Sequence, residues 1–246
     1  LYSIPQDVLK SMIKQTVFAT SQDQTKPILM GELLEIENGN INLVAIDGYR
    51  FAVRSCQVDN LSHEYIKAKI IIPGKTLIDV NSLLSSEEDV KVGFNEKNAI
   101  FILDETKIVT RLLDGEFIDY NKLCPREYNS KIKLKTRDLL NSIERASLLS
   151  QSELNNLIKL SIRDSVMAIT SNNEKGNVYE EVALSLEGDY LDIAFNSRYL
   201  LEGLKNIDCE EIFIEFTTNV NPCIIKPADG TKYTYLLLPV RISSNN

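Results

Sequence analysis

The sequence predicts an α+β protein made of two tandem copies of one domain of about 120 residues, each with two helices packed on mostly antiparallel sheets. Three observations support this fold class. An internal repeat has a long period, each half alternates helix-type and strand-type hydrophobic patterns, and the composition is that of a chain with a real core. Hydrophobic residues make up 43% of the 246 residues and charged residues 25%.

The repeat relates three segments of the first half to three segments of the second half, in the same order. The offsets are about 130, 123 and 122 residues, so the shortening falls in loops. We therefore expect domains over 1–124 and 130–246, joined by a weakly patterned linker over 123–131. The paired segments are 4–19 with 134–149, 71–84 with 194–207, and 88–103 with 210–225.

The first copy opens with a predicted helix over 5–20. Its apolar residues recur at three- and four-residue steps, with Lys10 and Lys14 on the other face. Two strand-like runs follow over 28–46, around the hairpin dipeptide Asn38-Gly39. A second helix over 73–85 is expected to begin at Pro73, and strands follow over 89–103 and 107–113. The core face of the first helix is Val8, Leu9, Met12, Ile13 and Val17.

The second copy repeats this order of elements. Helices are predicted over 136–149 and 197–206, and strands lie between and after them. The predicted strand regions are 156–170, 178–195, 210–217, 221–227 and 233–240.

The charge is unevenly distributed between the helices and the rest of the chain. The net charge is −8, which by itself argues against a nucleic-acid-binding protein. The four predicted helices, however, hold seven of the 27 basic residues and only five of the 35 acidic ones. Ordinary solvated helix faces explain so small an excess, and composition alone favours that explanation. A weakly basic surface that faces DNA phosphates is the functional alternative.

No motif supports an enzyme, a cofactor or a metal site. The sequence over 73–76, PGKT, ends like a phosphate-binding loop, but Lys69 stands where that motif needs its first glycine. His63 is the only histidine, which leaves a histidine-based triad or metal cluster without support. The four cysteines are interpreted as reduced packing residues, with a Cys209–Cys223 disulfide left open.

The run AIDGYRFAV over 45–53 interrupts a good strand pattern with an acid, a glycine and an arginine. A hairpin turn is the simpler interpretation, because Asp-Gly is a common turn dipeptide. The alternative is that the interruption holds a recognition surface in place.

Four segments resemble the bacterial sliding clamp family, the beta subunit of DNA polymerase III. They occur in the family's order, and the resemblance covers essentially the whole chain. It implies the DNA-clamp fold and matches the second and third of the family's three domains, so we expect the first domain to be missing. The segments are 42–55, 112–120, 193–204 and 235–242.

The resemblance implies a cytoplasmic, non-enzymatic processivity factor. In the family, two protomers close head to tail into a ring around duplex DNA, and peptides from polymerases, the clamp loader and repair proteins bind the clamp. Without the first domain, this chain is expected to be mainly monomeric and to hold DNA weakly. A generic interaction module and a nucleotide-binding enzyme, the latter from PGKT alone, are the alternatives.

The resemblance also implies two sets of functional residues. Tyr49, Ile118 and Lys122 depart from the residues common in the family, so the peptide site is expected to persist with altered detail. Tyr199 and Arg50 are expected to contribute most binding energy. The peptide-binding set is Leu29, Ile46, Gly48, Tyr49, Arg50, Phe51, Ile118, Lys122, Leu123, Leu154, Asn196, Tyr199, Val220, Pro222, Leu236, Leu238, Pro239, Val240, Arg241 and Ile242. The DNA-facing set is Lys10, Lys14, Lys26, Lys75, Arg137, Arg145, Arg198 and Lys205.

Overall fold

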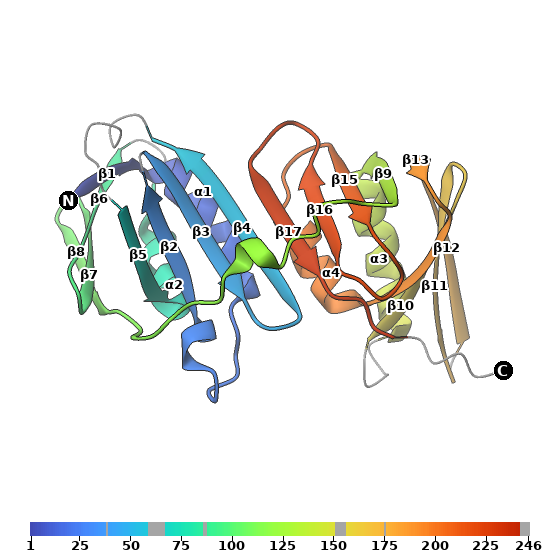
Figure 1. The fold of residues 1–246 in the computed structure, drawn as a ribbon, viewed down its shortest axis with the longest axis horizontal. Coiled ribbons are helices and arrows are strands. Elements are labelled where there is room, and N and C mark those ends of the chain that lie inside the picture. The colour runs from blue at the N-terminus through green and yellow to red at the C-terminus, as the bar shows by residue number, and fades with distance from the viewer. Residues whose placement is uncertain (38, 59–66, 86–87, 151–155, 175, 242–246) are drawn as a thin grey trace. The chain divides into compact units, whose positions relative to one another are not determined.

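The chain divides into two compact units, which contain Leu1–Asp119 and Tyr120–Asn246. The predicted linker over 123–131 falls in the second unit, and its last two residues begin a strand. Leu154, Ile242 and His63 lie outside the described residues. The computed structural model describes residues 1–37, 39–58, 67–85, 88–150, 156–174 and 176–241 (Figure 1).

The first unit alternates strands and helices in an order that begins and ends with strands. Its helices are α1 (Gln6–Thr16), η1 (Val17–Ala19), η2 (Pro27–Met30) and α2 (Gly74–Leu83). Its strands are β1 (Tyr2–Pro5), β2 (Gly31–Glu37), β3 (Asn40–Ile46), β4 (Arg50–Gln57), β5 (Lys67–Pro73), β6 (Asp89–Phe94), β7 (Asn98–Leu103) and β8 (Thr106–Arg111).

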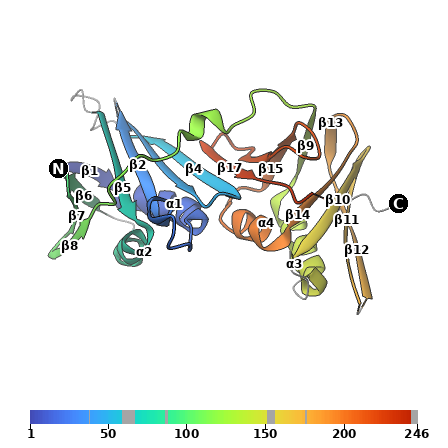
Figure 2. The same cartoon turned by 60° about the horizontal axis from the view of Figure 1, so that its bottom comes forward.

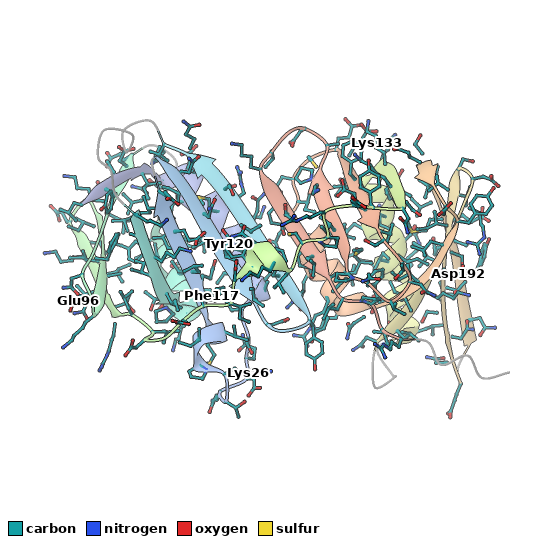
Figure 3. The ribbon with its side chains drawn as sticks, viewed as in Figure 1. Lys26, Glu96, Phe117, Tyr120, Lys133 and Asp192 are labelled. Carbon is teal, nitrogen blue, oxygen red and sulfur yellow. The ribbon has the colours of Figure 1, made fainter. Side chains whose placement is uncertain are left out.

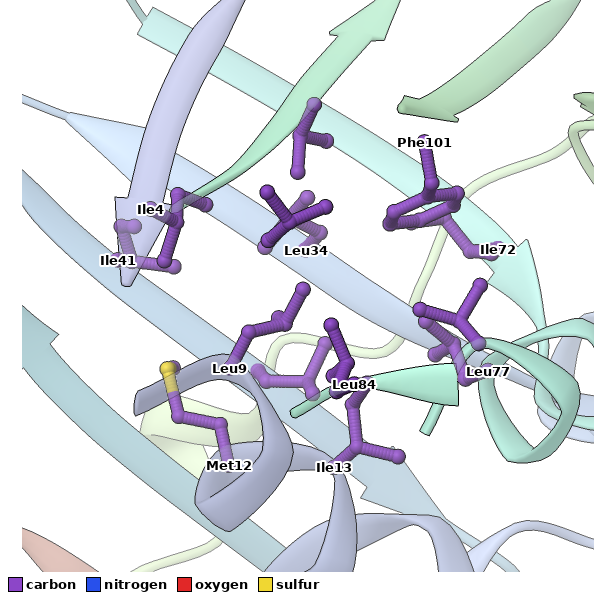
Figure 4. Packing of buried hydrophobic residues seen from close by; sticks show 14 of the residues in the cluster. Ile4, Leu9, Met12, Ile13, Leu34, Ile41, Ile72, Leu77, Leu84 and Phe101 are labelled. Atoms are coloured by element: carbon purple, nitrogen blue, oxygen red, sulfur yellow. The ribbon is translucent and has the colours of Figure 1, made fainter. Parts of the chain in front are cut away.

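These strands form two antiparallel sheets, in the orders β1-β6-β7-β8 and β4-β3-β2-β5. The core lies where the two sheets meet α1 and α2. Leu9, Met12 and Ile13 of α1 are buried there, beside Leu77 of α2 and Phe101 of β7 (Figure 4). The predicted apolar stripe of the first helix therefore faces the core, as its spacing indicated.

The second unit has the same order of elements with one additional strand. Its helices are η4 (Tyr120–Lys122), α3 (Thr136–Ser150) and α4 (Ser197–Leu204). Its strands are β9 (Ser130–Lys135), β10 (Leu157–Arg163), β11 (Val166–Asn173), β12 (Gly176–Ala183), β13 (Ser185–Gly188), β14 (Leu191–Asn196), β15 (Glu211–Phe216), β16 (Cys223–Pro227) and β17 (Tyr233–Leu237).

The sheets of the second unit confirm the predicted internal repeat. They run β12-β11-β10-β14 and β9-β15-β16-β17, and β13 adds to the edge of β9. Each sheet has its counterpart in the first unit, strand for strand, and α3 and α4 lie against one another as α1 and α2 do (Figure 2). The predicted α+β class of two tandem domains is therefore confirmed.

The junctions between strands and helices differ from the prediction. Pro73 ends β5 and is the N-cap of α2, and Pro5 does the same for β1 and α1. Neither proline offers a side-chain cap, but the backbone N–H of Gln6 donates to the Glu88 carbonyl at 3.0 Å. The equivalent N–H of Thr136 donates to the Glu210 carbonyl at 2.9 Å. A strand that feeds straight into a helix was missed three times, at β1, β5 and β9.

One acidic side chain lies inside the first unit. Glu32 of β2 is fully buried on the strand face that also carries Leu34 and Ile36. Its Oε2 lies 2.5 Å from the hydroxyl of Thr16 on α1, and that hydroxyl also lies 2.8 Å from the Met12 carbonyl. A hydroxyl has one proton to donate, and a carbonyl can only accept. The Thr16 hydroxyl can therefore donate its proton to either of these two oxygens.

The carboxyl group of Glu32 is buried without a charged partner, and this burial determines its protonation state. Removing the carboxylate from water raises the pKa of Glu32 from 4.5 to about 8, and the Thr16 hydrogen bond offsets only part of that effect. Glu32 is therefore mainly neutral at pH 7.

Candidate functional site

The turn between β3 and β4 is built by one carboxylate. Asp47 Oδ1 accepts hydrogen bonds from the backbone N–H groups of Tyr49 at 2.9 Å and Arg50 at 3.1 Å. The backbone N–H of Asp47 donates to the Arg50 carbonyl at 3.2 Å, which closes the hairpin. Gly48 has a φ of +99°, a conformation that favours glycine. The Asp-Gly turn signal was therefore correct.

Arg50 is held inside this turn. Its Nε donates to Asp47 Oδ2 at 2.9 Å, and its Nη2 donates to the carbonyl of Phe18 in η1 at 2.9 Å. The guanidinium carbon also lies 5.4 Å from the centroid of the Phe18 ring. As a result Arg50 is only 6% exposed, whereas Tyr49 beside it is 60% exposed. Sequence reasoning selected Arg50 as an energetic centre but missed Asp47 and Phe18, which hold it.

The other predicted residues of the first unit fall into two groups. Leu29, Ile46 and Phe51 are buried. Gly48 and Ile118 are exposed. Of the predicted residues in this unit, those at the tip of the turn and Ile118 are therefore the exposed ones.

The second unit positions Tyr199 through the start of α4. Asn196 is the N-cap, and its Oδ1 accepts from the backbone N–H groups of Arg198 at 3.0 Å and Tyr199 at 3.4 Å. At the other side, the hydroxyl of the fully buried Tyr235 donates to the Tyr199 carbonyl at 2.8 Å. The Tyr199 backbone is thus fixed by groups from β14 and β17, and its side chain is half-buried.

Several predicted residues lie together around that helix start. The Val240 N–H donates to the Ala194 carbonyl in β14 at 2.8 Å, which places the chain after β17 beside the strand that leads into α4. Cys223 pairs with Leu237 at the end of the β16–β17 ladder, and Pro222 and Leu238 are the next residues beyond that pair. Leu236 is buried, while the others form a half-buried to exposed, mostly apolar surface. Its members are Tyr199, Val220, Pro222, Leu238, Pro239, Val240 and Arg241, which we call the α4–β17 surface.

Lys122 and Leu123 are exposed at the end of η4 and just after it. They come from the same unit as the α4–β17 surface, but none of the hydrogen bonds described above links them to it.

Replacing Asn196 by alanine should destabilise the second unit by about 1 kcal/mol, the usual cost of a lost helix cap. Asn196→Asp keeps the acceptor and adds a negative charge near the helix N-terminus, so it should match or exceed the native stability. Urea unfolding of both variants measures the difference. Equal midpoints for the alanine and aspartate variants would show that the cap contributes nothing.

Most predicted DNA-facing residues with a described partner contact an acid. Arg145 pairs with Glu180 at 2.5 Å, Arg198 with Glu202 at 2.8 Å, and Lys205 with Glu144 at 2.8 Å. Lys10 instead donates to the Leu84 carbonyl at 2.9 Å, at the end of α2. The remaining members, Lys14, Lys26, Lys75 and Arg137, are exposed, with Lys26 on the loop before η2 (Figure 3).

The described residues give little support for a metal site, a phosphate-binding loop or reactive cysteines. No group of three or more His, Cys, Asp or Glu side chains there could hold a metal ion. The sequence over 73–76 is the end of β5 and the first turn of α2, with no loop before it. The four cysteines are free, and burial raises the pKa of the Cys223 thiol to about 12. None of the described helices is long and apolar enough to cross a membrane.

Two units of this topology, each with two helices against two antiparallel sheets, define a protein of the DNA-clamp class. The family models agree on the particular family. Residues 3–119 match the central domain of the DNA polymerase III beta subunit, and residues 121–241 match its C-terminal domain. The chain belongs to the DNA polymerase III beta subunit family.

Named relatives are beta sliding clamps. Those of Staphylococcus aureus strain Mu50 and Staphylococcus epidermidis are 38% identical to this chain over 237 residues, which is 95% of it and 62% of each relative. The chain therefore spans less than two thirds of their length.

Solved structures show the same likeness. The DNA polymerase sliding clamp of Bacillus subtilis superposes with a TM-score of 0.94 at 34% identity, over 98% of this chain and 64% of that one. The beta subunit of Streptococcus pyogenes gives 0.93 at 30% identity, over 98% and 66%. A DnaN sliding clamp of Pseudomonas aeruginosa bound to griselimycin gives 0.92 at 27% identity, over 98% and 65%.

Proposed function

We propose that this chain is the peptide-binding part of a bacterial sliding clamp, a non-catalytic processivity factor. Its partners are the replicative polymerase, the clamp loader and repair proteins, which attach through short clamp-binding peptides. In the full-length protein, two protomers form a ring around duplex DNA in the cytoplasm, close to the nucleoid. Family membership over nearly the whole chain supports this function.

The observation that carries the proposal is the α4–β17 surface. Val220 is 56% exposed and Leu238 39% exposed, in the same unit as Tyr199, whose backbone is fixed on both sides. Apolar groups that remain exposed around a preorganised aromatic side chain suit a short peptide with hydrophobic anchors. Binding then orders few protein groups, which lowers its entropic cost.

The proposed DNA contacts are weak ones. Arg145, Arg198 and Lys205 are already paired with carboxylates, so each gives up part of its attraction for phosphate. Few effective phosphate contacts mean low affinity, strong salt dependence and no sequence preference. A ring that slides along DNA benefits from such contacts, because tight binding would hold it in one place.

The test is fluorescence polarisation of a fluorescein-labelled peptide that carries the clamp-binding motif of a bacterial replicative polymerase. We expect saturable binding to the unmutated chain and a loss of about tenfold or more for Tyr199→Ala, because truncating a central aromatic side chain removes most of its buried contact area. Unlabelled griselimycin, which the Pseudomonas aeruginosa clamp binds, should displace the peptide.

The matched control is Tyr179→Ala, which removes another tyrosine of the same unit. Tyr179 lies on β12 with 64% of its surface exposed, and its hydroxyl donates to Glu181. This variant should bind the peptide like the unmutated chain. Equal losses for both tyrosines, or no binding by a folded chain, would refute the proposed peptide site.

A further inference from the structure

A cavity of about 150 Å³ lies in the second unit, between the chain over 125–128 and the β15–β16 strand pair. Glu215 and Ile224 are partners in that pair, so their side chains lie on the same face of the sheet. Ile224 is nevertheless only 4% exposed. It supplies one apolar wall of the cavity, whereas most of the other wall residues are polar.

Hydrogen bonds hold the two sides of this cavity together. The backbone N–H of Asn129 donates to the Phe216 carbonyl at 2.8 Å, and its Nδ2 donates to the Thr217 carbonyl at 2.7 Å. The Thr217 hydroxyl donates in return to the Glu127 carbonyl at 3.2 Å. The chain before β9 is thus fixed at the end of β15, so the cavity is preformed and binding orders few protein groups.

The acid in the cavity wall, Glu215, is already neutralised. Its Oε2 lies 2.7 Å from the Nζ of Lys226, which also lines the cavity, and its Oε1 lies 3.8 Å from the Nζ of Lys131. Two ammonium groups therefore face one carboxylate, which leaves a positive excess at the cavity. Glu127, the other acid of the lining, is exposed, so water weakens its repulsion of an anion.

Arg126 brings a further positive charge to the same cavity. Within the part of the chain that the structure describes, its guanidinium makes no hydrogen bond or ion pair. The planar fork of a guanidinium matches the two oxygens of a carboxylate. Tyr128 lines the cavity as well, and its ring centroid lies 5.4 Å from Lys131 Nζ.

The size of the cavity limits what can enter it. An apolar protein cavity of about 150 Å³ holds a molecule as large as benzene. Here Ile224 and Tyr128 provide surface for such a ring, and Arg126 and Lys226 provide the charges for one anionic group.

We propose that this cavity binds a small aromatic acid, with its ring against Ile224 and Tyr128 and its carboxylate on Arg126 and Lys226. A free acid and the C-terminal residue of a partner chain present the same chemistry. The cavity shares no residue with the α4–β17 surface, so this site does not depend on the proposed function.

The experiment titrates benzoate into the isotope-labelled chain and follows the backbone amide signals of residues 126–128 and 215–217 by NMR. We expect saturable shifts with a dissociation constant in the millimolar range, because one ring and one charge supply little binding energy. Arg126→Gln should weaken binding about tenfold or more. Arg137→Gln removes another exposed arginine of the same unit, on α3, and should leave benzoate binding unchanged.

Two further measurements test the sign of the charge. Glu215→Gln frees Lys226 from its carboxylate partner, so it should strengthen benzoate binding about two- to fivefold. Benzylamine carries the same ring with a positive charge and should give no saturable shifts. Weaker benzoate binding by Glu215→Gln, or benzylamine binding as tight as that of benzoate, would overturn the assignment of an anion site.

A short peptide that ends in phenylalanine separates the two sources of the carboxylate. Binding of this peptide with a free C-terminus, but not with a C-terminal amide, identifies the C-terminal residue of a chain as a ligand. Binding of benzoate alone identifies a free acid, and both results support the site. Three results would overturn it: no saturable shifts with either probe at about 10 mM, undiminished binding by Arg126→Gln, or shifts confined to the α4–β17 surface.

Discussion

Gly203→Ala should destabilise the second unit by about 1–3 kcal/mol, the usual cost of forcing an extra methyl group into a packed core. A β-carbon on Gly203 would clash with Cε1 of Tyr235 and would lie 2.6 Å from its Cδ1. That ring is fully buried. Alanine favours helices over glycine by about 1 kcal/mol, which offsets only part of the clash. Urea unfolding measures the net effect.

The same substitution should weaken peptide binding, because the displaced ring carries the hydroxyl that holds the Tyr199 carbonyl. Tyr235→Leu removes the obstructing ring, so the double variant Gly203→Ala/Tyr235→Leu should lose less stability than the sum of its single changes. Tyr235→Phe keeps the ring and removes only the hydroxyl, and it gives no such relief. A Gly203→Ala variant as stable as the unmutated protein would show that helix propensity outweighs the clash.

The unmutated protein should lose stability as pH rises because Glu32 ionises, and Glu32→Gln should abolish this loss. The pKa of Glu32 is about 8 in the folded state, against 4.5 ordinarily. Between these values the folded chain holds a proton that the unfolded chain has released, so the free energy of unfolding falls as pH increases. Below pH 4.5 both states are protonated and nothing is lost, and above about pH 8 the loss is complete. Its upper bound is about 3–5 kcal/mol.

Glutamine cannot ionise, so the stability of Glu32→Gln relative to the unmutated protein should rise from about pH 5 to about pH 8 and then level off. Guanidinium unfolding at several pH values across this window measures it. The control is Glu35→Gln on the opposite face of β2, where the carboxylate pairs with Lys69 at 2.5 Å. That variant should keep the pH dependence of the unmutated chain. Parallel curves for Glu32→Gln and the unmutated chain would rule out a buried neutral carboxyl group.

Periodicity predicted the helices well because each carries a stripe of apolar residues. Leu9, Met12 and Ile13 occupy one face of α1 and are buried as expected. The helix nevertheless ends at Thr16, four residues before the predicted end, and a 3-10 turn follows. Apolar spacing continues through Val17, so the pattern alone could not show where the hydrogen bonding changes.

Short strands were harder to predict than helices. β1 has four residues and runs directly into α1 at Pro5, where the proline favoured a helix start. The predicted strand regions over 156–170 and 178–195 became five strands, β10 to β14. Two of their turns depend on positive φ values, at Asp164 and Gly188. Asp164-Ser165 is not one of the paired turn residues that make a hairpin recognisable, and Gly188-Asp189, which is such a pair, joins strands of different sheets.

The sequence indicated which residues belong to the candidate site, but not which of them contact one another. The Asp47-Gly48 dipeptide announced a turn, yet nothing in the sequence showed that Phe18, 32 residues before Arg50, supplies a carbonyl to the arginine. Glu32 left a clearer signal, since it stands two residues before Leu34 on an inward strand face. An acid at such a position is worth examining as a buried neutral group.

In each unit, the first strand pairs with a strand that comes late in the sequence. Tyr2 of β1 pairs with Val92 of β6, and Ser130 of β9 pairs with Phe216 of β15. The first strand of each unit must therefore wait for more than two thirds of that unit to be synthesised before its sheet partner leaves the ribosome. Contacts between such distant residues slow folding, because a long loop is ordered before they form. For most of its synthesis each unit has an exposed strand edge, and this is the stage at which the nascent chain is most prone to aggregate.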